Sequence, residues 1–299
     1  MTTAYQTVTS ADGTPIALET TGDGPPVILV GGAFNDRSTV AGLAAVLAPQ
    51  FTAVTYDRRG RGRSGDSASY AVEREIEDLA AVIGRAGDTA GVFGHSSGAV
   101  LALEAAARGL AVGKVAAYEP TYVIDGTRPR PGDDLAGRLQ ALIGHGDRDE
   151  AVALFQAEAV GLPAEIIDAM RCGPVWGWFT GLAHTLPYDV ILCGPGMRLP
   201  AGRLAATQVP VLAIGGGASP SWLPAAARAV ADAIPGGRCV TLDGHDHGVL
   251  QQPAALGPLL ASFFGTGAEQ ARPSSSPALA ASSEICNSDR LEHTRDTAG

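Results

Sequence analysis

The stretch VFGHSSGAV, residues 92–100, places a serine between two glycines, directly after an apolar run and before an Ala/Leu-rich segment. The order Gly94-His95-Ser96-Ser97-Gly98 matches G-x-S-x-G, in which the glycines allow a sharp strand-to-helix turn that exposes the serine hydroxyl. A serine hydroxyl is a weak nucleophile, so it needs a base, a group that orients the base, and donors for the oxyanion. The motif predicts that Ser96 is a nucleophile, and that His95 points away from it and packs.

Short apolar runs recur on both sides of this motif, with helix-like stretches between most of them. The more uniformly apolar runs are typical of strands that are covered on both faces, as in a parallel sheet. This order predicts an α/β fold with a mostly parallel central sheet and helices on both of its faces. The predicted strands are YQTVTS (5–10), PIALET (15–20), PPVILVGG (25–32), FTAVTYD (51–57), AGVFGHS (90–96), KVAAYEP (114–120), VPVLAIGG (209–216) and RCVTLDG (238–244).

A long interval without a strand pattern separates the sixth and seventh predicted strands, and it exceeds what a crossover needs. We therefore expect residues 121–206 to form an inserted helical cap, and residues 1–120 and 207–266 to form the core. The predicted cap helices are DDLAGRLQALIG, RDEAVALFQAEAV, PAEIIDAMRCG and VWGWFTGLAHTL. Residues 267–299 are rich in Ser, Pro and Ala without apolar periodicity, which predicts a disordered tail.

The composition of the chain argues against several classes of binding partner. With 31 acidic and 21 basic residues the formal net charge is −10, which argues against a nucleic-acid partner or an anionic membrane surface. The sequence shows neither a signal-peptide pattern nor an apolar run long enough to span a membrane, so we expect a cytoplasmic protein. The four cysteines are widely spaced without a C-x-x-C pair, so we expect reduced thiols and no metal site.

A second motif follows the predicted strand at 51–57. The run YDRRGRGRSG, residues 56–65, resembles the D-x-R-G-x-G-x-S loop of the α/β-hydrolase superfamily, and with the G-x-S-x-G turn the resemblance spans most of residues 1–266. The same loop contains GRGRSG, a match to the dinucleotide fingerprint G-x-G-x-x-G. A true fingerprint lies in the first βαβ unit and is followed, about 20 residues later, by an acidic residue at the end of the second strand. This run has neither feature, so we expect no dinucleotide or other cofactor. Its arginines are expected to be solvated or paired with Asp57 and Asp66.

The resemblance implies where the oxyanion donors and the base lie. In the fold, one N–H belongs to the residue after the nucleophile, here Ser97, and one to the loop after the third strand, here Ala33. The histidine follows the last strand, where TLDGHDHGV offers His245 and His247. We favour His247, because it leads into an apolar helix start, and His245 is the alternative.

The acid departs from the usual pattern of the family. Relatives carry an Asp after the strand that follows the cap, but no Asp or Glu occurs here from Val211 until Asp232. The superfamily tolerates a second location after the preceding strand, as in some haloalkane dehalogenases. There Glu119 ends an apolar strand, and a buried carboxylate would need a partner such as a histidine N–H. Asp125 and Asp243 are the alternatives.

The resemblance and the nucleophile together predict the reaction. A serine rather than an aspartate argues against the alkyl-ester mechanism of dehalogenases and epoxide hydrolases of this fold. We expect a cofactor-independent serine hydrolase acting on an ester, lactone or related acyl bond. C–C hydrolase, perhydrolase-like or lyase chemistry, or a ligand-binding member with little turnover, are the alternatives. Phe34, Trp176, Trp178 and Phe179 are expected to line the pocket and to favour a small hydrophobic substrate. The oligomeric state is left open.

Overall fold

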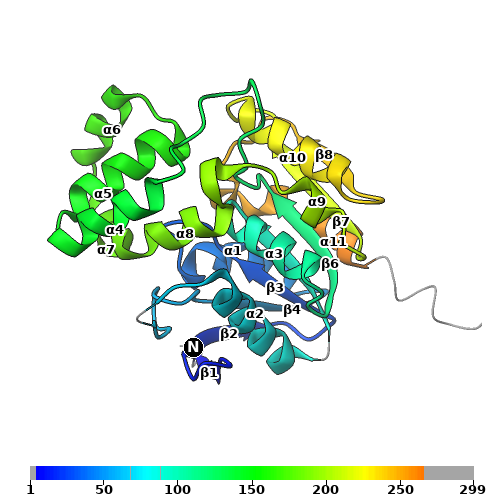
Figure 1. The fold of residues 1–299 in the computed structure, drawn as a ribbon. Helices are drawn as coiled ribbons and strands as arrows, with labels where there is room; N and C mark the ends of the chain where they lie inside the picture. The colour runs from blue at the N-terminus through cyan, green and yellow to red at the C-terminus, as the bar shows by residue number, and fades with distance from the viewer. Residues whose placement is uncertain (1–4, 68, 88, 266–299) are drawn as a thin grey trace, which may run out of the picture. The chain divides into compact units, whose positions relative to one another are not determined.

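The computed structural model describes residues 5–67, 69–87 and 89–265. All eight predicted strands are present in one sheet, in the order β1-β2-β4-β3-β5-β6-β7-β8 (Figure 1). The pairs that involve β1 and β2 are antiparallel, and the pairs from β4 to β8 are parallel. The bounds are β1 Gln6–Thr9, β2 Pro15–Thr21, β3 Pro26–Val30, β4 Thr52–Tyr56, β5 Ala90–His95, β6 Val112–Tyr118, β7 Val211–Gly216 and β8 Arg238–Leu242. The predicted tail at 267–299 lies outside the described residues.

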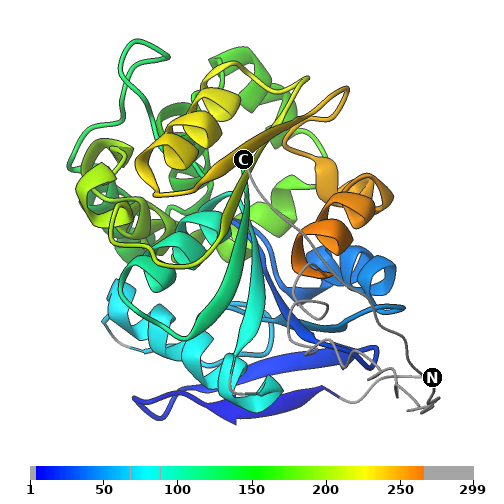
Figure 2. The ribbon, with the colours of Figure 1, turned by 90° about the vertical axis from the view of Figure 1, so that its right-hand side faces the viewer.

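Helices cover both faces of the sheet, which confirms the predicted fold class (Figure 2). The helices α2 (Val72–Ala86), α3 (Ser97–Ala107) and α10 (Trp222–Ala233) pack on one face, and α1 (Ala41–Leu47) and α11 (Gly257–Gly265) pack on the other. Successive strand side chains point to opposite faces, so Val92 of β5 joins the first cluster and Phe93 joins the second. Burial on both faces explains why the strands read as uniformly apolar.

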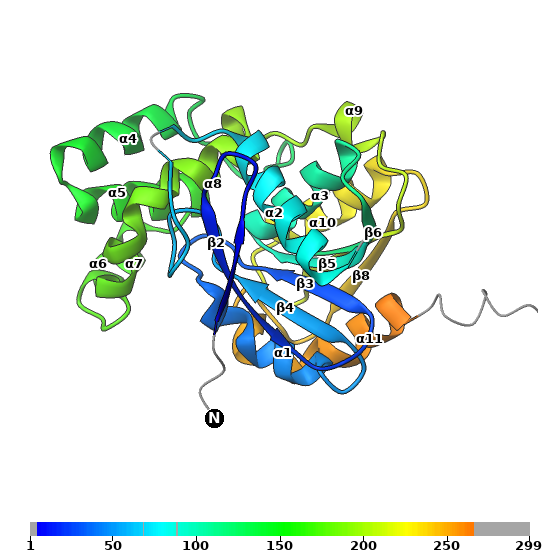
Figure 3. The same cartoon turned by 90° about the horizontal axis from the view of Figure 1, so that it is seen from below.

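A helical insertion connects β6 to β7. It contains α4 (Leu135–His145), α5 (Arg148–Phe155) with a π-helical turn at Gln156–Val160, α6 (Ala164–Arg171), α7 (Trp176–Leu182), α8 (Leu186–Cys193) and the short α9 (Ala201–Leu204). The helices α4 to α7 gather at one side of the sheet (Figures 1 and 3). The described residues up to Gly265 fall in one compact unit, and a separate cap domain at 121–206 stays a prediction.

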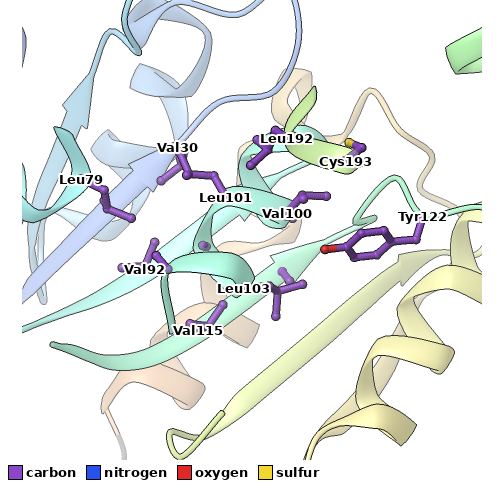
Figure 4. Close-up of a cluster of buried hydrophobic side chains, with 14 of the residues drawn as sticks. Val30, Leu79, Val92, Val100, Leu101, Leu103, Val115, Tyr122, Leu192 and Cys193 are labelled. Atoms are coloured by element: carbon purple, nitrogen blue, oxygen red, sulfur yellow. The ribbon is translucent and has the colours of Figure 1, made fainter. Parts of the chain in front are cut away.

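The sequence prediction missed α8, because it treated Leu186 as the end of the preceding helix. A short 3-10 turn instead ends that segment, and Pro187 stands in the first turn of a new helix, a position that proline favours. The helix α8 contacts α4 of the insertion and also α3 and α2 of the core. Its residues Leu192 and Cys193 share a buried cluster with Val100 and Leu101 of α3 (Figure 4). This packing holds α8 over the N-terminal part of α3.

None of the helices in the described ranges combines the length and the apolar content needed to cross a bilayer.

Candidate active site

Ser96 lies at the turn between β5 and α3, with φ 60° and ψ −125°. Only glycine fits at the two flanking positions, because a Cβ on Gly94 would lie 2.3 Å from the Gly98 carbonyl oxygen. A Cβ on Gly98 would lie 2.4 Å from the carbonyl oxygen of Val30. The local structure therefore has the strained strand-to-helix turn that the G-x-S-x-G pattern predicts.

Backbone strain is concentrated around this turn. Four non-glycine residues of the described chain have a positive φ: Phe34 (58°), Ser96 (60°), Glu119 (46°) and Met197 (49°). The first three are residues that the sequence assigns to the site. Such conformations are unfavourable for residues with a Cβ and persist where the surrounding structure enforces them, often at functional sites.

Glu119 and His247 are in direct contact. The Glu119 side chain is fully buried, and its Oε2 lies 2.7 Å from Nδ1 of His247. Its other oxygen, Oε1, accepts a hydrogen bond of 2.8 Å from the Gly216 N–H. An ionised carboxylate only accepts hydrogen bonds, so the Nδ1 of a neutral His247 carries the proton and its Nε2 is left as a base.

Gly216, the last residue of β7, lies against the Glu119 carboxylate. A Cβ at this position would lie 2.9 Å from Glu119 Oε1 and 2.6 Å from the His245 carbonyl oxygen. The carboxylate reaches across from the end of β6 and occupies the space beside the end of β7. The small residues of VLAIGGG thus leave room for the Glu119 side chain.

The alternative acids and the alternative histidine have other partners. Asp125 has a side chain that is 88% exposed and pairs with Arg130 at 2.8 Å. The His245 Nδ1 lies 2.8 Å from the Asp243 backbone oxygen. Within the described residues, neither Asp125 nor Asp243 forms a hydrogen bond or ion pair with either histidine through its side chain. The geometry favours Glu119 and His247, whose catalytic roles stay a prediction.

The Ser96 N–H donates to the Tyr118 carbonyl oxygen at 2.9 Å, which places the serine beside Glu119 at the edge of the sheet. Its Oγ makes no hydrogen bond to a protein group in the described ranges. The neighbouring residue, His95, places its ring 4.6 Å from that of His247, centroid to centroid. Apo structures often show long or absent catalytic hydrogen bonds, which form when substrate binds.

His95 is buried beneath the His247 loop. Its Nε2 lies 2.9 Å from the His247 carbonyl oxygen and must donate the hydrogen bond, and its ring stacks on Tyr118. Tyr118 donates in turn to the Asp246 carbonyl oxygen at 2.7 Å. Burial, and then the proximity of His247, lower the pKa of His95 to about 3. His95 is therefore neutral at physiological pH and anchors the backbone that carries His247.

Replacing His95 with glutamine is expected to remove an acid-dependent loss of stability. In the wild type the unfolded His95 takes up a proton near pH 6.5, but the folded residue does so only near pH 3. Protonation therefore stabilises the unfolded state, and the free energy of unfolding falls by about 2 kcal/mol between neutral pH and pH 5. Urea unfolding at pH 7 and pH 5 measures this decrease. It should be absent in His95→Gln and present in the control His145→Gln, which replaces an exposed histidine. An unchanged pH slope in His95→Gln would contradict the assignment.

The loop after β3 lies against the nucleophile. A Cβ on Gly32 would lie 2.7 Å from Ser96 Cβ, and the Gly32 N–H donates to Asn35 Oδ1 at 2.9 Å. Neither the Ala33 N–H nor the Ser97 N–H donates to a protein acceptor in the described part of the chain. Both N–H groups could therefore donate to an oxyanion, and their role as oxyanion donors stays a prediction. Asn35 was not anticipated, although Asn side chains commonly hydrogen-bond nearby backbone groups in turns.

The prediction that the arginines of residues 58–63 are solvated or pair with Asp57 and Asp66 is wrong for three of them. Arg58, Arg59 and Arg61 are at most 2% exposed. Their acidic partners come from distant elements: Arg58 pairs with Glu75 and Asp189, Arg59 with Asp12 and Asp78, and Arg61 with Asp189. The helices α2 and α8 cover the loop and supply most of these acids, which a local reading of the sequence does not reveal.

Aromatic side chains connect the insertion to the loop after β3. The ring of Phe34 lies 4.3 Å from that of Phe179 and 5.4 Å from that of Phe155, which the sequence analysis did not single out. Trp176 is buried and contacts Phe179 edge-on. Trp178 is 46% exposed, and its Nε1 donates to the Phe34 carbonyl oxygen at 2.7 Å. Phe179 and Trp178 thus contact Phe34 of this loop, Trp178 through its polar edge, and Trp176 contacts Phe179. That these residues line a substrate pocket stays a prediction.

Comparison with known proteins is consistent with this architecture. A model described as the alpha/beta hydrolase family matches residues 27–257. The crystal structure of an alpha/beta hydrolase from Sphaerobacter thermophilus DSM 20745 is 50% identical, with a TM-score of 0.81, and covers 87% of this chain and 100% of that chain. The chain belongs to the alpha/beta hydrolase family.

Other similarities are more distant or more local. The enol-lactonase from Burkholderia xenovorans LB400 is 20% identical with a TM-score of 0.66, over 88% of this chain and 100% of that one, and so shares the fold. An uncharacterized hydrolase, YraK, from Bacillus subtilis (strain 168) is 38% identical over 96 residues. That stretch spans 31% of this chain and 35% of the Bacillus protein.

Proposed function

We propose that this protein is a cofactor-independent serine hydrolase that cleaves an ester, lactone or related acyl bond of a small hydrophobic substrate. The observation that supports it most strongly is the buried Glu119 carboxylate, 2.7 Å from His247 and beside the strained turn that carries Ser96. An acid–histidine pair beside a serine at such a turn is the arrangement that acyl transfer needs.

The proposed reaction follows from the roles of these groups. Ser96 Oγ attacks the carbonyl carbon while His247 Nε2 takes its proton, and Glu119 stabilises the resulting imidazolium. The N–H groups of Ala33 and Ser97 donate to the oxyanion of the tetrahedral intermediate. His247 then protonates the leaving alcohol, and a water molecule activated by the same histidine hydrolyses the acyl-enzyme.

The aromatic residues around Phe34 support an apolar substrate. Phe34, Phe155 and Phe179 lie next to the loop that carries the proposed oxyanion donor. Within the described residues, no arginine or lysine lies over the ring of Phe34, Phe155 or Phe179, and Arg171 lies over the neighbouring Trp176. An uncharged acyl group of small or medium size is therefore the expected substrate.

Turnover of a series of p-nitrophenyl acyl esters and simple lactones tests the proposal. We expect ester hydrolysis with a burst of p-nitrophenol that is stoichiometric with enzyme, because this activated leaving group departs faster than water hydrolyses the acyl-enzyme. Short and medium acyl chains should give the highest kcat/KM. Absence of both burst and turnover across the series would overturn the proposal and favour a ligand-binding role.

A further inference from the structure

A cluster of buried charges lies beneath the proposed oxyanion hole. Arg58, Arg61, Glu75 and Asp189 are each at most 2% exposed. Asp189, from α8 of the insertion, accepts from Arg61 Nη2 at 2.8 and 2.9 Å and from Arg58 Nη1 at 2.9 Å. Arg58 is also held by both oxygens of Glu75. Burial raises the pKa of Asp189, but Arg61 and Arg58 outweigh it and lower that pKa below its usual value.

The cluster contacts the Gly32–Ala33 peptide and the side chain of Ser97. Arg61 Nη1 donates to the Gly32 carbonyl oxygen, which belongs to the same peptide unit as the Ala33 N–H. The Ser97 hydroxyl donates to Asp189 Oδ1 at 2.6 Å and accepts from Arg58 Nη1 at 3.1 Å. The Gly32–Ala33 peptide and the Ser97 side chain are therefore each held by a charged side chain.

We propose that Arg61, held by Asp189 of α8, is a positioning residue that orients the Ala33 N–H toward the oxyanion. In a trans peptide the carbonyl oxygen and the following N–H point in opposite directions, so holding the Gly32 oxygen aims the Ala33 N–H away from Arg61. The cationic partner also polarises that peptide, which strengthens the N–H as a donor. This inference rests on the proposed hydrolase function and adds the insertion helix α8 to the machinery of the site.

Arg59 shows that the same loop can bury an arginine without this role. Arg59 is fully buried, and its partners among the described residues lie outside the site: Asp78, Asp12, Ser67 and the Arg74 carbonyl oxygen. Arg61 instead reaches the Gly32 carbonyl even though its own Nε, buried in the described structure, has no hydrogen-bond partner. An orphaned buried donor is unfavourable, and such groups persist where another requirement fixes the side chain.

The test compares Arg61→Met with Arg59→Met, its matched control, in the full-length protein with p-nitrophenyl butyrate as substrate. Arg61→Met is expected to lower kcat about 10- to 100-fold and to change KM less than about threefold, because an oxyanion donor acts in the transition state. A trifluoromethyl ketone, which forms an anionic tetrahedral adduct on serine, should bind more weakly by about the same factor. The pH midpoint of kcat/KM should not move. Arg59→Met should lower the melting temperature and keep kcat within about threefold.

Two further variants keep the test valid if Arg61→Met does not fold. Arg61→Lys retains a charge but not the fork that reaches both Gly32 and Asp189, and it should reduce kcat less than methionine does. Asp189→Asn should reduce kcat at an unchanged pH midpoint.

Equal losses of kcat in the Arg61 and Arg59 variants, or a rise in KM alone, would overturn the inference while the hydrolase proposal stands. A wild-type protein that neither hydrolyses the ester nor binds the ketone would overturn both.

Discussion

Replacing Ser96 with alanine is expected to lower kcat for ester hydrolysis by a factor of about 10⁴ or more, and to abolish covalent labelling by a fluorophosphonate. Alanine has the same Cβ as serine, so it meets the same backbone strain at φ 60° and should leave the turn intact. Ester turnover and intact mass after labelling measure the effect.

Ser97→Ala is the matched control, because it removes a hydroxyl from the adjacent residue but keeps both the nucleophile and the Ser97 N–H. It should label at Ser96, and more slowly than the wild type, since the Ser97 hydroxyl contacts Asp189. Stoichiometric labelling of Ser96→Ala at another residue would show that the nucleophile lies elsewhere.

Replacing Glu119 with glutamine is expected to lower kcat by about 10⁴ with little loss of stability. The amide oxygen can still accept from the Gly216 N–H, which leaves the NH₂ group facing His247 Nδ1. An NH₂ group donates, so Nδ1 must become an acceptor and the proton moves to Nε2. His247 then cannot take the proton of Ser96. Steady-state kinetics and a thermal melt measure the two effects.

Asp125→Asn and Asp243→Asn are the controls for Glu119→Gln, since each removes an alternative acid. Both should keep kcat within a few-fold of the wild type, because neither side chain is joined to a histidine in the described structure. A larger loss in either of them than in Glu119→Gln would identify a different acid.

The sequence predicts the strands and the turn because their signals are local. The eight apolar runs and the G-x-S-x-G spacing depend on residues close together in the chain, and the structure has all of them. Glu119 and His247 are 128 residues apart, but Glu119 directly follows β6 and His247 lies in the loop after β8, at the same edge of the parallel sheet. Strand order alone therefore brings them close, and the absence of an acid after β7 directs attention to Glu119.

The contacts of the buried arginines in the loop at residues 58–63 could not be predicted in this way. Asp189 lies 128 residues from Arg61, in a helix that the sequence analysis did not recognise. A single acid within the apolar run LPYDVILC is the signal that was available, since a buried carboxylate needs a charged partner. The identity of that partner depends on how α8 packs on α3, which periodicity does not specify. The contact between Trp178 and Phe34 could not be predicted either, because it depends on where α7 lies relative to the loop after β3.

The most direct test of the account is the rate of covalent labelling by a fluorophosphonate probe, in wild type and Glu119→Gln side by side, followed by intact mass. We expect a single adduct on Ser96 in the wild type. In the folded Glu119→Gln variant the labelling rate should be lower by at least about 10³-fold. Equal labelling rates in the two proteins would contradict the assignment of Glu119, and no labelling of either would contradict the serine hydrolase function itself.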